Sequence, residues 1–150
     1  MTPGRAGSKF VVLAAAEDNV TTAELEAIPL FESLSEDDRR EIASWLSART
    51  VGEGVQLIGE GASGYCFFIL TEGDAVVTAG GKGLASLGPG DFFGEVAILD
   101  GGRRTATVTT SSPARVLVMF GTEFRKLEQT HPGVAARIDA TMRQRVENRN

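Results

Sequence analysis

The feature that most constrains the fold of this sequence is a series of short apolar runs between residues 51 and 120. Glycine clusters separate these runs at intervals of about ten residues, as in antiparallel strands joined by tight turns. Seven or eight such strands protect their edges best in a closed or double-sheet barrel of the jelly-roll kind. We therefore expect a mainly β fold with flanking helices, in which an eight-stranded antiparallel, jelly-roll-like β-roll covers about residues 50–120. The runs are VQLI, YCFFIL, AVVTA, LASL, TATVTT and ARVLVMF.

Two helices are predicted before the roll. Thr21, with a glutamate three residues later, forms a capping-box pattern ahead of a short helix that Pro29 ends. Ser35 caps a second helix, whose acidic first turn suits the positive end of the helix dipole and which we expect to end near Arg49. Residues 1–20 carry little periodicity and are predicted to be a flexible N-terminal arm.

Two further helices are expected after the roll, over about residues 122–148. Thr122 is placed to cap the first, and the HPG stretch at 131–133 breaks it. In the second, apolar residues recur every four positions and offer a narrow face to the roll, to a protein partner or to a second copy of the chain. We expect residues 21–150 to form one domain. The apolar face comprises Val134, Ile138, Met142 and Val146.

Composition excludes several classes of protein. The formal net charge is −5, so the chain lacks the basic surface that neutralises a nucleic-acid backbone, and no direct nucleic-acid partner is expected. No run approaches the roughly 20 apolar residues that span a bilayer, so no membrane partner is expected either. A single cysteine, Cys66, excludes an internal disulfide framework and suits a reducing compartment, which favours a cytoplasmic location.

The sequence contains no recognisable catalytic or metal-binding constellation. Its sole histidine, His131, stands at a helix break, and Cys66 lies inside an apolar run; neither has a visible catalytic partner. A metal-binding cupin, which is another β-roll, would need clustered histidines. We therefore expect no enzyme activity, no catalytic residue, no metal and no cofactor.

The segment GDFFGEVAILDGGRRTATV, residues 90–108, contains an arginine predicted to point inward. Strand alternation places Arg104 on the same side as Ala106 and Val108, and Arg103 on the opposite side with Thr105. An inward guanidinium stays charged and needs an anion. Three outcomes are open: an ion pair with Glu95, escape to solvent at the strand end, or a bound phosphate.

The residues before this arginine are suited to a nucleotide. GEVAIL can form a helical turn whose backbone N–H groups, at Val96 and Ala97, face an anion, while Gly94 permits close approach of the backbone. Glu95 would repel a phosphate and is better suited to accept hydroxyl protons from a sugar. One arginine and one helical turn balance about one negative charge, as in a phosphodiester.

FGEVAIL followed by RTATV resembles the phosphate-binding cassette of cyclic nucleotide-binding domains. The resemblance extends from the Leu30-Phe31 pair through GEG, IGEGASG and FILTEGDAVV to about Leu127. It implies a β-roll with helices on both sides and cAMP or cGMP lying over the cassette.

The resemblance also implies roles for individual residues. Glu95 would hold the ribose 2′-hydroxyl, and Arg104 would hold the cyclic phosphate with the backbone N–H groups of Val96, Ala97 and Thr105. Thr105 is similar to the threonine of cyclic nucleotide-gated channels that helps to accept guanine, so cGMP stays open beside cAMP. Because alternation directs Thr105 away from Arg104, this role requires a local bend at the start of the strand; the alternative is that Thr105 is an exposed strand-forming residue. The purine and ribose wall would comprise Val77, Ala85, Leu87 and Phe93, and the lid Met142 or Arg145.

The function expected from these features is a non-catalytic sensor or regulatory domain that binds a cyclic nucleotide, with cAMP placed before cGMP. The transcription factors of this family append a winged helix-turn-helix, but only 30 residues follow Phe120, too few for both the lid helices and that module, so direct DNA binding is not expected. The kinase regulatory subunits of the family would carry a substrate-like basic motif before the domain, whereas the first ten residues contain only Arg5 and Lys9 as basic residues, so that role has little support. The alternatives are a ligand-free β-roll used for protein interaction and a regulatory domain of a larger enzyme, channel or transporter.

Overall fold

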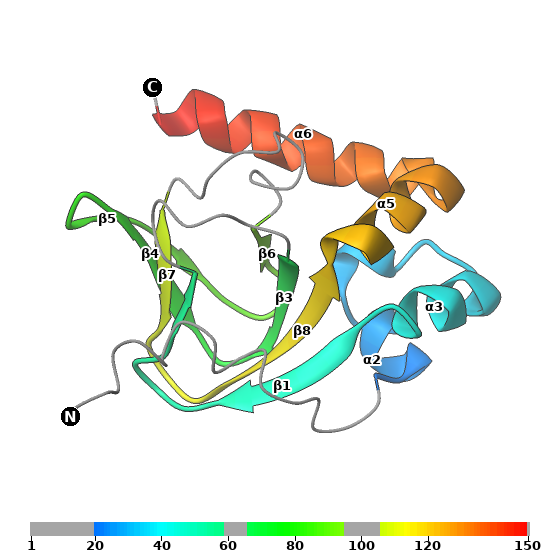
Figure 1. Cartoon of the computed structure of the whole chain (residues 1–150), viewed down its shortest axis with the longest axis horizontal. Helices are drawn as coiled ribbons and strands as arrows, with labels where there is room; N and C mark the ends of the chain where they lie inside the picture. Colours follow the sequence, from blue (N-terminus) through cyan, green and yellow to red (C-terminus); the bar gives the residue numbers. More distant parts are fainter. Residues whose placement is uncertain (1–19, 59–65, 95–105, 150) are drawn as a thin grey trace.

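The computed structural model describes residues 20–58, 66–94 and 106–149, without the side chains of 58, 66, 142 and 145–149. The described strands form two four-stranded antiparallel sheets, ordered β1-β8-β3-β6 and β2-β7-β4-β5 (Figure 1). The expected eight-stranded β-roll is therefore confirmed. The strands are β1 (Ser47–Val51), β2 (Gln56–Ile58), β3 (Cys66–Glu72), β4 (Ala75–Ala79), β5 (Lys82–Leu87), β6 (Phe92–Phe93), β7 (Thr107–Thr110) and β8 (Ala114–Phe120).

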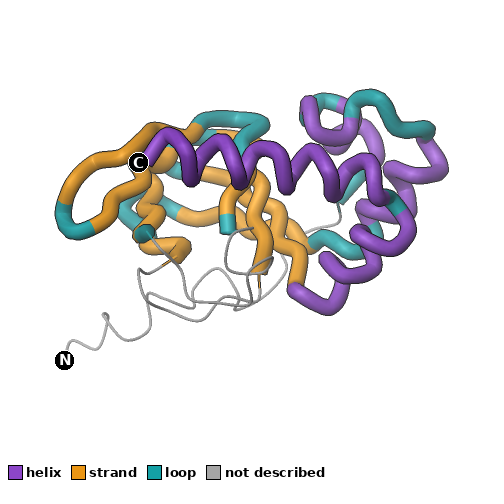
Figure 2. The backbone as a smooth tube through the Cα atoms, turned by 90° about the horizontal axis from the view of Figure 1, so that it is seen from above, coloured by secondary structure: helices purple, strands orange, loops and turns teal. Residues whose placement is uncertain are grey.

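Helices lie on both sides of the roll in the sequence but gather at one end of it in space. Helices α2, α3 and α5 form this group, and α6 extends from it across the roll toward the side that carries the β4–β5 hairpin (Figures 1 and 2). The helical segments are α2 (Thr22–Glu26), η2 (Pro29–Phe31), α3 (Glu36–Ala43), α5 (Gly121–Thr130) and α6 (Pro132–Arg149).

The second predicted helix is shorter than expected. It ends at Ala43, not near Arg49. A turn follows, in which the N–H groups of Trp45 and Leu46 each donate a hydrogen bond to the carbonyl three residues earlier. From Ser47 the backbone pairs with β8. The prediction was wrong because these backbone groups gain hydrogen bonds from a strand distant in sequence, which helix periodicity cannot reveal.

Two of the three predicted side-chain caps are present. The hydroxyl oxygens of Thr21 and Ser35 each accept a hydrogen bond of 3.1 Å from the backbone N–H three residues later. Thr122 does not cap α5, contrary to prediction, because the helix already begins at Gly121 and the Thr122 hydroxyl donates to the Glu123 carboxylate at 2.8 Å. The start of a helix that follows a strand directly is set by that strand's end rather than by a cap residue.

The sheet β1-β8-β3-β6 is buried on both faces. Its outer face packs against the helices and its inner face packs against the second sheet. Strand β8 shows the alternation, because Leu117 and Met119 belong to the outer cluster while Val116 and Val118 belong to the inner one. The roll therefore has its own apolar interior, separate from the core beneath the helices.

Candidate functional site

The predicted cassette connects the two sheets. Strand β6, which precedes it, pairs with β3 in one sheet, and β7, which follows it, lies between β2 and β4 in the other. The segment between them therefore leaves one sheet and enters the other. Five of the predicted site residues lie in this segment, outside the described residues: Glu95, Val96, Ala97, Arg104 and Thr105.

Gly94, the predicted point of close approach, is the last described residue before the cassette. Its φ is 92°, in the left-handed region that glycine enters without the steric cost of a Cβ. It is half-buried. The structure thus supplies a conformational reason for glycine at this position.

The strand before the cassette is held by two aromatic contacts, one on each face of its sheet. Phe93 stacks on Phe68, with ring centroids 5.1 Å apart and an interplanar angle of 5°. Phe92 contacts Phe67 on the outer face at 5.4 Å. Phe93 is 4% exposed within the interior cluster of the roll. This predicted wall residue therefore anchors the strand that leads to the cassette.

The strand after the cassette follows the predicted alternation in its described part. Ala106, Val108 and Thr110 are buried, whereas Thr107 and Thr109 are only partly buried. A bend at Ala106 precedes β7, and Val108 lies in the interior cluster of the roll. Among the described residues, the face that alternation predicts for Arg104 is therefore the buried face of this strand.

The other three predicted wall residues share one face of the second sheet. Val77 lies opposite Ala85 on one side and opposite Val108 on the other, and Leu87 lies opposite Ala75. Residues directly opposite in antiparallel strands point to the same side. Val77 and Leu87 pack against the interior of the roll, whereas Ala85 is not covered by any described part of the chain and is exposed. The structure therefore brings these three residues together on the inner face.

A hydrogen-bonded turn, which the sequence indicated only as a glycine turn, carries the chain from β5 to β6. The Asp91 carboxylate accepts the Gly88 N–H at 2.8 Å, and the Asp91 carbonyl accepts the Leu70 N–H at 2.8 Å. Gly90 returns a bond to the Leu70 carbonyl at 2.7 Å, with a φ of 95°. The turn thus fixes the start of β6, and the Gly-x-Gly-Asp pattern was its signal in the sequence.

Helix α6 is docked at its beginning on the N-terminal helices. Val134 and Ile138 are buried in the helical cluster. The Arg137 guanidinium donates to the Leu30 carbonyl at 2.9 Å and to the Ser33 hydroxyl at 2.6 Å. The predicted lid residues Met142 and Arg145 lie further along α6, and their side chains are outside the described residues.

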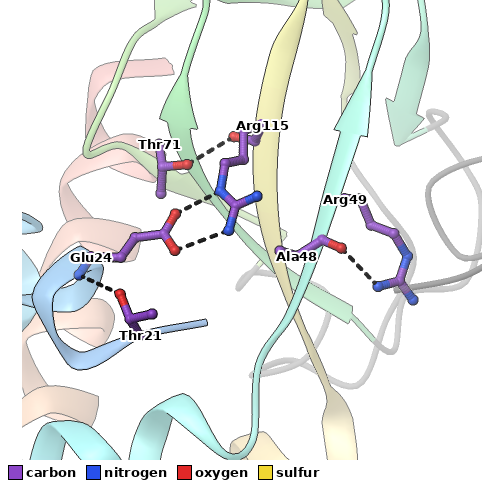
Figure 3. A network of polar contacts seen from close by, with 6 residues as sticks. All are labelled: Thr21, Glu24, Ala48, Arg49, Thr71 and Arg115. Carbon is purple, nitrogen blue, oxygen red and sulfur yellow. Dashed lines mark hydrogen bonds and ion pairs between the residues drawn. The ribbon is translucent and has the colours of Figure 1, made fainter. Parts of the chain in front are cut away.

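A partly buried ion pair that sequence reasoning missed ties α2 to the roll (Figure 3). Arg115 on β8 donates to both carboxylate oxygens of Glu24, at 2.7 and 3.0 Å, and the two side chains are 14% and 19% exposed. Its partners are 91 residues apart, so no local pattern could have indicated it. Because it lies on the helical side, we assign it to stability rather than to ligand binding.

Arg49, which is buried, lies on the inner face of β1, opposite Val116. The one described hydrogen bond of its side chain goes to the neighbouring Ala48 carbonyl at 3.3 Å, and its Nε has no partner among the described residues (Figure 3).

No described helix of the chain is long and apolar enough to cross a membrane.

The family model described as "Cyclic nucleotide-binding domain" matches residues 48–131, from β1 to the end of α5 and across the cassette. The chain belongs to this family. A cAMP-dependent protein kinase regulatory subunit of Eremothecium gossypii is 38% identical over 104 residues, which make up 69% of this chain and 23% of that protein. A cyclic nucleotide-gated potassium channel of Mesorhizobium japonicum is 35% identical over 109 residues, 73% of this chain and 30% of the channel.

Solved structures show the same fold. The catabolite activator protein of Thermus thermophilus superposes with a TM-score of 0.72 at 27% identity, over 80% of this chain and 59% of that one. The cAMP-bound protein PfPKA-R superposes with a TM-score of 0.74 at 24% identity, over 85% of this chain and 45% of that one. The chain spans only about a quarter of the regulatory subunit and less than a third of the channel.

Proposed function

We propose that this domain binds a cyclic nucleotide between its two sheets and acts as a non-catalytic sensor. The observation that carries the proposal is the position of the cassette: the family match spans it, and its two flanking strands lie in different sheets. The inner face beside β7 carries Val77, Ala85 and Leu87 at the positions proposed for the purine wall. Regulatory subunits and channels among the relatives support a regulatory role without catalysis.

Within this site, Arg104 is the proposed phosphate ligand and Glu95 the proposed ribose ligand. The residues described after the cassette support the proposed inward direction of Arg104, because the alternate residues Ala106 and Val108 are buried. The left-handed φ of Gly94 supports a backbone that turns sharply into the cassette. A guanidinium in this position would neutralise the single charge of a cyclic phosphodiester.

We propose cAMP as the preferred ligand and cGMP as the weaker one. Support for cAMP comes from the relatives named as cAMP-dependent kinase regulatory subunits and from the cAMP-bound neighbour in the fold comparison. Binding of cGMP would depend on Thr105, whose hydroxyl would have to reach the purine to help accept guanine. We further propose that the bound state is passed to a protein partner, or to other parts of a longer chain, through α6.

Isothermal titration of the full chain with cAMP and cGMP tests this function, with 5′-AMP as a control of similar size and higher charge. We expect one site per chain, tighter binding of cAMP than of cGMP, and much weaker binding of 5′-AMP. Absence of heat and of any thermal shift with millimolar cyclic nucleotide would instead support a ligand-free interaction module. Equal binding of all three would show general nucleotide affinity rather than recognition of the cyclic phosphate.

A further inference from the structure

Three side chains of the kind that bind metal ions converge where α3 meets the junction of α5 and α6. Asp38 and Glu41 stand three residues apart on α3, and therefore on one face of that helix. His131 stands between α5 and α6. One ligand atom from each side chain lies within 4.8 Å of the other two. The site is remote in sequence from the proposed cassette and does not depend on its function.

The charges around this cluster are unbalanced. The Asp38 carboxylate has no hydrogen bond or ion pair among the described residues, and Glu41 pairs there only with His131, whose Nε2 is 2.9 Å from its Oε1. The two neighbouring arginines are engaged elsewhere: Arg40 pairs with two other acids of α3, and Arg39 donates to three backbone carbonyls. Two carboxylates held this close repel each other, and a cation between them would remove that repulsion.

The histidine is held in place before any ion binds. Its side chain is 8% exposed, and the edge of the ring contacts Trp45, with centroids 6.1 Å apart. Its backbone N–H donates to the Leu127 carbonyl at 2.8 Å. Glu41 is 49% exposed, so solvent reaches the cluster from that side and water can complete a coordination shell. The arrangement is therefore rigid at the nitrogen ligand and open at a carboxylate.

We propose that Asp38, Glu41 and His131 bind a divalent transition-metal ion, with Zn²⁺ the best match to one imidazole and two carboxylates. Such a ligand set is common for Zn²⁺, whereas Mg²⁺ and Ca²⁺ prefer oxygen alone. The ion would replace the direct contact between the His131 ring and the Glu41 carboxylate. The positive end of the α3 dipole, equivalent to about half a charge, would repel the ion, but the two carboxylates attract it with two full negative charges.

The proposed ion would join two parts of the chain that are distant in sequence. Asp38 and Glu41 belong to the N-terminal helices, whereas His131 stands at the start of α6. Because the unfolded chain does not hold these ligands together, binding would stabilise the folded state and the docked position of α6.

Titration of Zn²⁺ into the untagged full chain, with the thiol removed by Cys66→Ser, tests the proposal. We expect one ion per chain and an increase in melting temperature. Asp38→Asn and Glu41→Gln should each weaken Zn²⁺ binding at least about tenfold, as loss of a ligand does. Asp37→Asn is the matched control: it makes the same change one residue away, at a side chain that pairs with Arg40, and should leave the affinity unchanged.

A second measurement follows the histidine itself. His131 is the only histidine of the 150 residues, so its ring signals in a ¹⁵N spectrum need no assignment. Zn²⁺ should shift the Nε2 resonance in the control variant, and in Asp38→Asn the midpoint of this shift should require at least about tenfold more Zn²⁺. The proposal is overturned if Zn²⁺ leaves the ring signals unchanged, if the variants bind like the control, or if Mg²⁺ or Ca²⁺ binds more tightly than Zn²⁺.

Discussion

Arg103 and Arg104 are neighbours in the sequence, but strand alternation assigns them to opposite faces. Arg104→Ala should weaken cAMP binding about thirty-fold to several-thousand-fold, since removing one partner of a buried charge pair costs about 2–5 kcal/mol. Arg103→Ala should have a much smaller effect, because an exposed charge contributes little. Calorimetric titration of both variants measures the difference. Equal losses would show that the assignment of faces is wrong.

Gly73, in the turn between β3 and β4, has no room for a side chain. Its φ is 85°, and a Cβ there would overlap the Pro113 carbonyl oxygen and lie 2.8 Å from the Ala114 Cα. Gly73→Ala should therefore lower the free energy of unfolding by about 2–4 kcal/mol. Gly54→Ala is the control, because Gly54 has a φ of 80° but nothing within 4 Å of the added atom, so strain alone should cost about 1 kcal/mol. Urea unfolding compares the two, and similar losses would exclude the steric clash as the main cause.

Helix α2 is attached to the roll by the Glu24–Arg115 ion pair. Glu24→Ala leaves a guanidinium that is 14% exposed without its carboxylate and should cost about 2–3 kcal/mol of folding free energy. Adding Arg115→Met should recover part of this loss, because the charge that has lost the Glu24 carboxylate is then removed. In contrast, Arg40→Ala breaks two ion pairs of a side chain that is 63% exposed and should cost less than about 0.5 kcal/mol. If denaturant titration gives equal losses for Glu24→Ala and Arg40→Ala, the pair is not a structural tie.

Helix α6 has a docked beginning and a distal part that extends over the roll. Removing residues 142–150 keeps Val134, Arg137 and Ile138, so the melting temperature without ligand should change little. If Met142 or Arg145 covers the purine, the shortened chain should bind cAMP about 5- to 150-fold more weakly, for a loss of about 1–3 kcal/mol. Unchanged affinity by calorimetry would show that the distal part of α6 is not a lid.

At the scale of the whole molecule, the helical core and the interior of the roll share one sheet. Each strand of that sheet contributes to both clusters, as β8 does with Leu117 and Val116. Loss of either core would therefore expose the other, and we expect a single cooperative unfolding transition with equal calorimetric and van't Hoff enthalpies. Two separate peaks in differential scanning calorimetry would mean that the helices and the roll unfold independently.

The sequence predicted most of the fold because its signals are local. Glycine turns and short apolar runs indicate strands within a few residues of where they occur, and the caps at Thr21 and Ser35 lie three residues from the amides that they accept. The prediction was wrong at Arg49, where pairing with β8 converts an expected helix end into a strand. It also could not find the Glu24–Arg115 pair, which depends on contacts across the fold.

The candidate site also combines features that local sequence signals indicate with features that depend on contacts across the fold. The sequence by itself indicated a phosphate-binding cassette, because the chemistry of a phosphate site depends on residue types at fixed spacing; the roles of its residues stay predictions. Only the tertiary structure decided that β6 and β7 enter different sheets, that Val77, Ala85 and Leu87 share a face, and that the beginning of α6 packs on the N-terminal helices. These relations arise from pairing and packing between segments far apart along the chain, whose partners no local pattern specifies.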